Sequence, residues 1–121
     1  MTNLAGPLLD LSVVVPIYNE EESLEELVTQ LLNALRPTKE NFEIVLVNDG
    51  STDQTTDVLT KLSSEIPEIV AVLLRKNYGQ TAAMAAGFDV ASGEIVVSLD
   101  GDLQNDPADI PLVVAKLREG Y

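Results

Sequence analysis

The sequence predicts an α/β fold in which a mainly parallel sheet lies between layers of helices. Short apolar segments rich in β-branched residues alternate along the chain with segments whose apolar residues recur at helical spacing. The strand segments are apolar on both faces, which is typical of strands that helices cover from both sides. Regular alternation of strand and helix implies parallel strands joined by right-handed crossovers.

Four strands and four helices are predicted in alternation. The strands are expected at residues 11–17, 42–48, 69–74 and 94–99, the last of them as a buried strand. The helices are expected at residues 21–35, after a cap at Ser51, at 80–91, and from about 106–109 to a cap at Gly120.

Four local signals refine these elements. Pro16 has no N–H to donate, so sheet pairing is expected to end near it. Ser51 followed by Gln54 is a capping-box pattern at the start of the second helix. The alanine-rich third helix, with Gly87, is expected to pack closely on the sheet. The last helix is expected to turn four apolar side chains inward: Ile110, Val113, Val114 and Leu117.

Composition and charge narrow the class of protein. With 121 residues, 45% of them hydrophobic and 22% charged, the chain has the composition of one globular domain or part of one. Its net charge of −13 argues against binding to nucleic acid or to anionic lipid. The sequence contains no cysteine or histidine, which excludes disulfides, thiolate metal sites and Ser-His or Cys-His catalysis within it. The sequence shows no signal peptide and no transmembrane segment.

Polar residues follow every predicted strand, at the edge where open α/β sheets bind their ligands. These strand-end segments are residues 16–20, 48–51, 75–79 and 100–102. The Gly-x-Gly-x-x-Gly fingerprint and the P-loop motif are both absent from the sequence, which disfavours NAD, FAD and P-loop nucleotidase chemistry.

The most informative of these segments contains Asp100 and Asp102, directly after the fourth strand. Side chains two residues apart in extended backbone share a face, so the two carboxylates are expected to point the same way. A divalent cation relieves their repulsion, and hard oxygen ligands suit Mg²⁺ or Mn²⁺, which in turn bind phosphate oxygens. The alternative is a solvated turn, because Asp, Gly and Asn are common in loops.

Four motifs, in this order, resemble the family 2 glycosyltransferases. They are Val-Val-Pro-Ile-Tyr-Asn-Glu-Glu at 14–21, Val-Asn-Asp-Gly-Ser-Thr-Asp at 47–53, Arg-Lys-Asn-Tyr-Gly at 75–79, and Leu-Asp-Gly-Asp-Leu-Gln-Asn-Asp-Pro at 99–107. The sequence is most similar to the polyprenyl-phosphate, dolichol-phosphate-mannose-synthase-like branch. The resemblance implies a Rossmann-like, three-layer GT-A nucleotide-sugar-binding domain. Residues 1–121 would be its N-terminal part, incomplete at the C-terminus.

The resemblance implies a nucleoside pocket lined by Pro16, Tyr18 and Glu20, with Asp49 holding the base or ribose. Each of these residues also has a structural interpretation. The Tyr18 ring would pack at the sheet edge, Glu20 would complement the helix dipole, and Asp49 would be a turn residue. Many relatives have a second aspartate where this chain has Asn48, so the pocket would carry one charge fewer.

The resemblance also implies that Asp100 and Asp102 are the catalytic pair that meets the metal, Mg²⁺ or Mn²⁺, and the nucleotide diphosphate. Asp100 would contact the nucleotide as well, and Gln104 would be a further metal ligand. Arg75 and Asn77 would lie near the donor.

The implied activity is metal-dependent, inverting transfer of a sugar from a UDP- or GDP-linked donor to a polyprenyl phosphate of dolichyl or undecaprenyl type. An acceptor phosphate is already anionic, so the reaction would need no strong general base. The acceptor site and membrane anchors would lie beyond residue 121. The full-length protein would then work on the cytoplasmic side of a membrane. Residues 1–121 would be soluble, inactive alone and open to homo-oligomer formation through exposed apolar surface.

Other functions remain open at this point. They include a family 2 transferase with a hydroxyl acceptor, and a nucleotide- and metal-binding module without activity. A response-regulator receiver is disfavoured because its aspartates would follow the first and third strands. A haloacid-dehalogenase-type phosphatase is disfavoured because its Asp-x-Asp normally follows the first strand, with Thr where this chain has Gln104.

Overall fold

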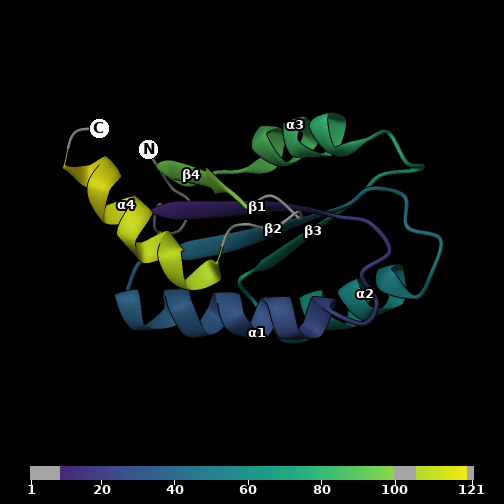
Figure 1. The fold of residues 1–121 in the computed structure, drawn as a ribbon, viewed down its shortest axis with the longest axis horizontal. Helices are drawn as coiled ribbons and strands as arrows, with labels where there is room; N and C mark the ends of the chain where they lie inside the picture. The colour runs from purple at the N-terminus through teal and green to yellow at the C-terminus, as the bar shows by residue number, and fades with distance from the viewer. Residues whose placement is uncertain (1–8, 100–105, 120–121) are drawn as a thin grey trace, which may run out of the picture.

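A four-stranded sheet forms the centre of the structure, a computed structural model that describes residues 9–99 and 106–119 (Figure 1). Its strands are β1 (Leu11–Ile17), β2 (Phe42–Asn48), β3 (Ile69–Leu73) and β4 (Ile95–Ser98). They lie in the order β3-β2-β1-β4, and every pairing is parallel. The sequence-based prediction of an α/β fold with a parallel sheet is therefore confirmed.

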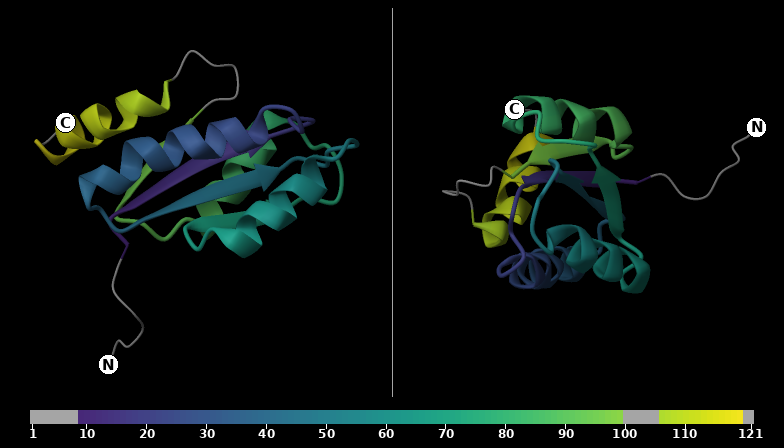
Figure 2. Two further views of the ribbon diagram at one scale, coloured as in Figure 1. Left: turned by 90° about the horizontal axis from the view of Figure 1, so that it is seen from below. Right: turned by 90° about the vertical axis from the view of Figure 1, so that its right-hand side faces the viewer.

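The helices form a layer on each face of this sheet. They are α1 (Leu24–Leu35), α2 (Thr55–Glu65), α3 (Gln80–Val90) and α4 (Ile110–Arg118), the last preceded by a short 3-10 turn at Pro107–Asp109. α1 and α2 cover one face and α3 covers the other, while α4 lies against α1 (Figures 1 and 2). Within the described residues, no helix is long and apolar enough to cross a membrane.

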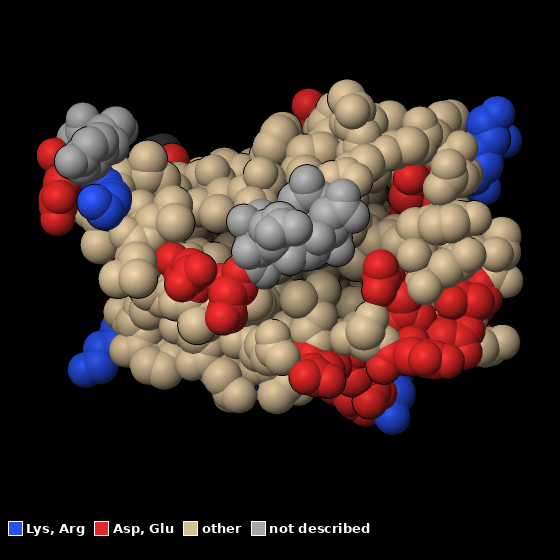
Figure 3. All heavy atoms as spheres, in the orientation of Figure 1, with Lys and Arg blue, Asp and Glu red and all other residues tan. Residues whose placement is uncertain are grey.

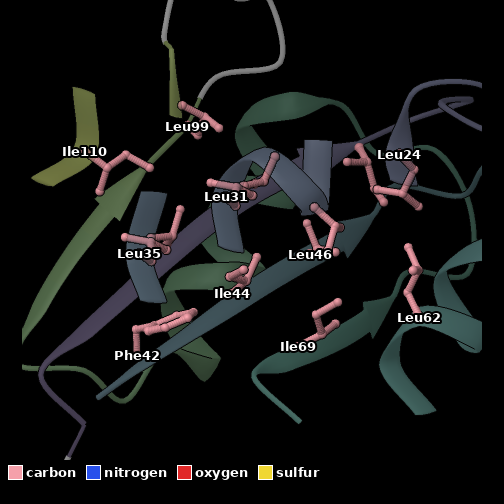
Figure 4. Close-up of a cluster of buried hydrophobic side chains, with 14 of the residues drawn as sticks. Leu24, Leu31, Leu35, Phe42, Ile44, Leu46, Leu62, Ile69, Leu99 and Ile110 are labelled. Carbon is pink, nitrogen blue, oxygen red and sulfur yellow. The ribbon is translucent and has the colours of Figure 1, made fainter. Parts of the chain in front are cut away.

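The larger part of the core lies between the sheet and the layer of α1 and α2 (Figure 4). Alternate residues of β1 and β2, such as Val13 and Ile44, meet the leucines of α1 there. On the opposite face, Val14 and Val47 pack against α3. A Cβ added at Gly87 would overlap a Val14 methyl and lie 3.0 Å from Val47 Cγ2. The close approach of α3 to the sheet is therefore confirmed.

The fourth strand was expected to be buried, and this expectation is wrong. β1 is the strand that pairs with β4 among the described residues, so β4 lies at the edge of the sheet. Its side chains alternate between half-buried and exposed, and Val96 is 40% exposed. An apolar run alone does not distinguish a central strand from an edge strand, because both can be rich in valine and isoleucine.

The inward face of the last helix is narrower than predicted. Ile110 and Val114, one turn apart, are buried, but Val113 and Leu117 are 44% and 37% exposed. α4 therefore contacts the rest of the described chain along one narrow stripe. The expected cap at Gly120 lies outside the described residues.

The first helix begins later than predicted, at Leu24 instead of residue 21. The backbone N–H groups of Ser23 and Leu24 both donate to the Glu20 carbonyl, so residues 18–23 form a turn before the helix. Apart from the start of α2, the other boundaries agree within about two residues, the usual uncertainty of element ends.

Candidate functional site

The loops that follow β1, β2 and β3 meet at one edge of the sheet, where they form a pocket of about 320 Å³. The residues that line it come from all three loops and from the start of α3: Pro16, Ile17, Tyr18, Glu20, Asp49, Asn77, Gly79 and Gln80. All four nucleoside-pocket candidates lie here, together with Asn77. Arg75 is exposed and is not among the described residues that line the pocket.

The first wall of the pocket is the end of β1. Pro16 is in register with Val47, and pairing to β2 continues one residue further, to Ile17. The Tyr18 side chain is 42% exposed, so its ring is not packed into the core. The Glu20 side chain accepts a hydrogen bond of 2.7 Å from the Ser23 hydroxyl through Oε1. One oxygen of the Glu20 carboxylate, Oε1, is therefore hydrogen-bonded within the turn before α1.

The Asp49 carboxylate joins the second loop to the third. Asp49 follows β2 directly and is only 4% exposed. Its Oδ1 accepts from the Tyr78 backbone N–H at 2.8 Å, and its Oδ2 accepts from the Gly79 N–H at 3.0 Å. The Asn77 side-chain amide donates to Oδ2 at 3.3 Å and to the Asp49 carbonyl at 3.2 Å. Asp49 therefore fixes the loop between β3 and α3 as well as lining the pocket.

Gly50 allows these two loops to approach each other. It has a φ of +68°, and a Cβ at this position would overlap the backbone of Lys76 and lie 2.4 Å from the Asn77 nitrogen. Glycine is the residue that combines a positive φ with such close backbone contact. Asn77 and Asp49 can hydrogen-bond because Gly50 leaves this space.

Further hydrogen bonds fasten the first loop to the second. Asn19, which has a positive φ of 52°, accepts from the Thr52 N–H at 2.8 Å and donates its own N–H to the Ser51 hydroxyl at 2.9 Å. The Glu20 N–H donates to the Thr55 hydroxyl at 2.8 Å. Several motif residues that sequence analysis treated only as part of a pattern thus hold the pocket loops together.

The capping box predicted at Ser51 and Gln54 is wrong. α2 begins at Thr55, and the Ser51 hydroxyl accepts from Asn19 in the neighbouring loop. The Asp53 side chain takes the place of the cap, accepting from the Thr55 N–H at 2.8 Å and from its hydroxyl at 2.5 Å. Desolvation raises the pKa of the Asp53 carboxyl, but the hydrogen bonds from Thr55, together with those at Glu21, outweigh it and leave the pKa lowered.

Asn48 is not part of the pocket lining. Its side chain is 2% exposed and turns toward α2, where Nδ2 donates to the Thr56 hydroxyl at 2.8 Å. Its Oδ1 accepts from the Ser51 N–H at 3.1 Å, which holds the backbone of the loop after β2. The asparagine that stands here in place of an aspartate therefore changes the charge of the loop after β2, and not the charge of the pocket lining.

The candidate metal ligands Asp100, Asp102 and Gln104 lie outside the described residues. Leu99, just before them, is buried and donates its N–H to the Val14 carbonyl at 2.9 Å, so it continues the pairing of β4 with β1. Within residues 9–99 and 106–119, no group of three or more acidic side chains is arranged to hold a metal ion. The described part of the chain thus supplies the pocket but no metal centre of its own.

Acidic side chains gather at the end of the molecule where α1 begins (Figure 3). Glu21, Glu22, Glu25 and Glu26 are all exposed. In a chain with a net charge of −13, such a surface repels phosphate groups, so a nucleotide diphosphate needs a cation or a tightly fitted pocket to bind.

A parallel sheet covered by helices, with a pocket at the carboxyl ends of its strands, is typical of three-layer α/β domains that bind a ligand. The sequence model of Glycosyl transferase family 2 matches residues 12–121. The chain belongs to this family.

Curated relatives of the chain support its assignment to this family. The undecaprenyl-phosphate 4-deoxy-4-formamido-L-arabinose transferases of Salmonella choleraesuis (strain SC-B67) and Salmonella typhimurium (strain LT2) are each 45% identical to the chain over 118 residues. These residues are 97% of this chain but 36% of each relative, so the chain spans about a third of the length of the curated relatives it matches.

Two solved structures share the fold. S. aureus TarS 1–349 in complex with UDP-GlcNAc has a TM-score of 0.74 and 30% identity, over 92% of this chain and 32% of its own. The mannosyltransferase PcManGT from Pyrobaculum calidifontis, in complex with GDP-Man and Mn²⁺, has a TM-score of 0.70 and 28% identity, over 85% and 30%. The GT-A architecture expected from the motifs is therefore confirmed.

Proposed function

We propose that this chain is the nucleotide-sugar-binding part of an inverting glycosyltransferase that transfers a sugar to a polyprenyl phosphate. The observation that carries the proposal is the pocket at the strand ends, which Pro16, Tyr18, Glu20, Asp49 and Asn77 line together. Family membership and the names of the Salmonella relatives support both the reaction and the acceptor class.

The size of the pocket suits a nucleoside. Small-molecule sites range upward from about 300 Å³, so the volume of about 320 Å³ fits a base and ribose better than a whole nucleotide sugar. The exposed ring of Tyr18 offers a face on which a base can stack, and Glu20 and Asp49 offer acceptors for ribose hydroxyls or a base N–H. The sugar and the diphosphate would then extend beyond the pocket.

The motif after β4 would hold the diphosphate. Carboxylates and a side-chain amide oxygen are suitable ligands for Mg²⁺ or Mn²⁺, and we assign Asp100, Asp102 and Gln104 to this role. When bound, such an ion neutralises charge on the departing diphosphate. Asp100 and Asp102 would position it, and Arg75 would lie nearer the donor phosphates than the base.

The acceptor determines which acid-base groups the enzyme needs. A polyprenyl phosphate oxygen is already an anionic nucleophile, so it can attack the anomeric carbon while the bond to the diphosphate breaks and the diphosphate leaves with the electron pair. This step requires no general base. A lipid-linked acceptor also implies that the whole protein works at a membrane surface, on the cytoplasmic side.

The proposal is tested by calorimetric titration of the chain with UDP and with GDP, each with and without Mn²⁺. We expect metal-dependent binding of one nucleotide, and loss of the metal dependence in Asp102→Asn. Glu26→Gln, an exposed acid-to-amide change on α1, is the matched control and is expected to bind like the unmodified chain. A folded chain that binds neither nucleotide would refute the proposal.

A further inference from the structure

The hydrogen bonds around Asp49 limit which nucleobase its carboxylate can recognise. An ionised carboxylate has about four acceptor positions, two on each oxygen. Gly79 N–H and the Asn77 amide occupy both positions of Oδ2, and Tyr78 N–H occupies one position of Oδ1. Among the hydrogen bonds of residues 9–99 and 106–119, one position remains unoccupied, on Oδ1. Asp49 lines the pocket, so a ligand that enters can use this position.

Uracil and guanine differ in how many N–H groups they present to a carboxylate. Uracil has a single ring N–H between two carbonyls. Guanine presents a ring N–H and an amino N–H side by side, and a single carboxylate can accept from both only when each of its oxygens has a free position. The solved relatives include a complex with UDP-GlcNAc and one with GDP-Man, so both bases are relevant to this family.

We infer that Asn77 is a specificity-determining residue, which restricts Asp49 to one base N–H and so selects a uridine over a guanosine nucleotide. The inference rests on the proposed nucleotide-binding function. The Asn77 bond to Oδ2, at 3.3 Å, is the longest of the three and comes from a side chain, so a substitution can remove it. The two backbone donors, Tyr78 and Gly79, stay in place.

The geometry around Asn77 supports a role of this kind. The residue lines the pocket, and Gly50 leaves the space that lets its amide reach both the carboxylate and the carbonyl of Asp49. Asn77 therefore acts on the base through Asp49 and holds the acceptor atoms in place.

The test compares UDP and GDP affinity, both with Mn²⁺, for the unmodified chain and for Asn77→Ala. Asn33→Ala is the matched control, because Asn33 is exposed on α1. We expect the unmodified chain to prefer UDP. The substitution Asn77→Ala frees Oδ2 for a second base N–H, so the preference is expected to shrink on the order of tenfold, mainly through tighter GDP binding. Asn33→Ala is expected to keep the original preference.

Several outcomes would overturn the inference. They are a preference of the unmodified chain for GDP, an equal loss of affinity for both nucleotides in Asn77→Ala, and unchanged affinities in that variant. Failure of the unmodified chain to bind either nucleotide would instead refute the proposed function, and this inference with it. If Asn77→Ala does not fold by circular dichroism, Asn77→Ser provides the same comparison with a polar side chain too short to bridge to Oδ2.

Discussion

The strand β2 carries a buried carboxylate near each end, and the two behave differently. Asp49, at the carboxyl end, is 4% exposed and lines the pocket. Glu43, near the amino end, is 7% exposed, and its Oε2 accepts from the Ser12 hydroxyl at 2.6 Å and from the Ser92 N–H at 2.8 Å. Both carboxylates join separate segments through hydrogen bonds, and Asp49 in addition lines the pocket formed by the described residues.

This comparison separates a structural role from a ligand-binding one. Glu43 joins β1, β2 and the connection between α3 and β4, because the Ser12 hydroxyl also accepts from the Gly93 N–H at 2.7 Å. The hydrogen bonds of Glu43 therefore have a structural role. Asp49, by the hydrogen bonds of the described residues, has one acceptor position left for a ligand. Burial and hydrogen bonding are therefore not sufficient to identify a functional carboxylate, and the adjoining cavity decides between the two roles.

The largest effect is expected from Glu43→Ala. The substitution leaves the Ser12 hydroxyl and the Ser92 N–H without their acceptor, and Ser12 is fully buried. We expect a loss of about 3 kcal/mol in the free energy of unfolding, measured by urea denaturation. Glu65→Ala, at the exposed end of α2, should change stability little. A loss at Glu43 no larger than at Glu65 would contradict a structural role for this network.

Gly50→Ala is expected to cost about 2 kcal/mol, because a Cβ here needs a positive φ and overlaps the backbone of Lys76. The loops after β2 and β3 must then separate, which also removes the contact between Asp49 and Asn77. We therefore expect weaker nucleotide binding together with lower stability. Thermal unfolding and calorimetry on the same sample measure both, and normal binding in Gly50→Ala would show that the pocket tolerates this separation.

Asp49→Asn and Glu43→Gln form a matched pair, since each replaces a buried carboxylate of β2 by an amide. Asp49→Asn should weaken UDP binding by about 1.5 kcal/mol, roughly tenfold, because an acceptor oxygen is lost beside the pocket. Glu43→Gln should leave the affinity of the folded protein unchanged. Equal effects of the two substitutions on nucleotide affinity would remove the distinction between the two ends of β2.

The sequence predicted the order of elements and the location of the site for clear physical reasons. Strands that are apolar on both faces, such as β1 and β2, and that alternate with helices are typical of a parallel sheet, and parallel strands bring their carboxyl ends to one edge. This reasoning placed Tyr18 and Asp49 near each other although 31 positions separate them in the chain.

The interactions between loops could not be predicted from the sequence. Ser51 fits a local capping pattern, but its hydroxyl is used by Asn19 in another loop, and no periodicity encodes such a contact. The edge position of β4 depends likewise on which strands are its neighbours. The asparagine at position 19 was a weak signal in the sequence, since asparagine adopts the positive φ found there more readily than most non-glycine residues.

The smallest effect concerns a third carboxylate, Glu68, which precedes β3 and is more exposed than Asp49 and Glu43. Arg36 donates to it through Nε at 3.3 Å and Nη2 at 3.1 Å, and this hydrogen-bonded ion pair lowers the pKa of Glu68 below its ordinary 4.5. A lowered pKa in the folded state stabilises the protein above about pH 4.5, and this contribution disappears as the pH falls through the folded-state value.

Glu68→Gln should therefore reduce the free energy of unfolding at pH 7 by less than about 1 kcal/mol, because the pair is at the surface and screened by solvent. The difference from the unmodified chain should shrink as the pH falls below about 4.5 and disappear below the folded-state pKa of Glu68, and it should also shrink in high salt at pH 7. Glu65→Gln, which changes the net charge equally from an exposed position, controls for overall charge. If the two variants have the same pH profile, the ion pair with Arg36 contributes nothing specific to the free energy of unfolding.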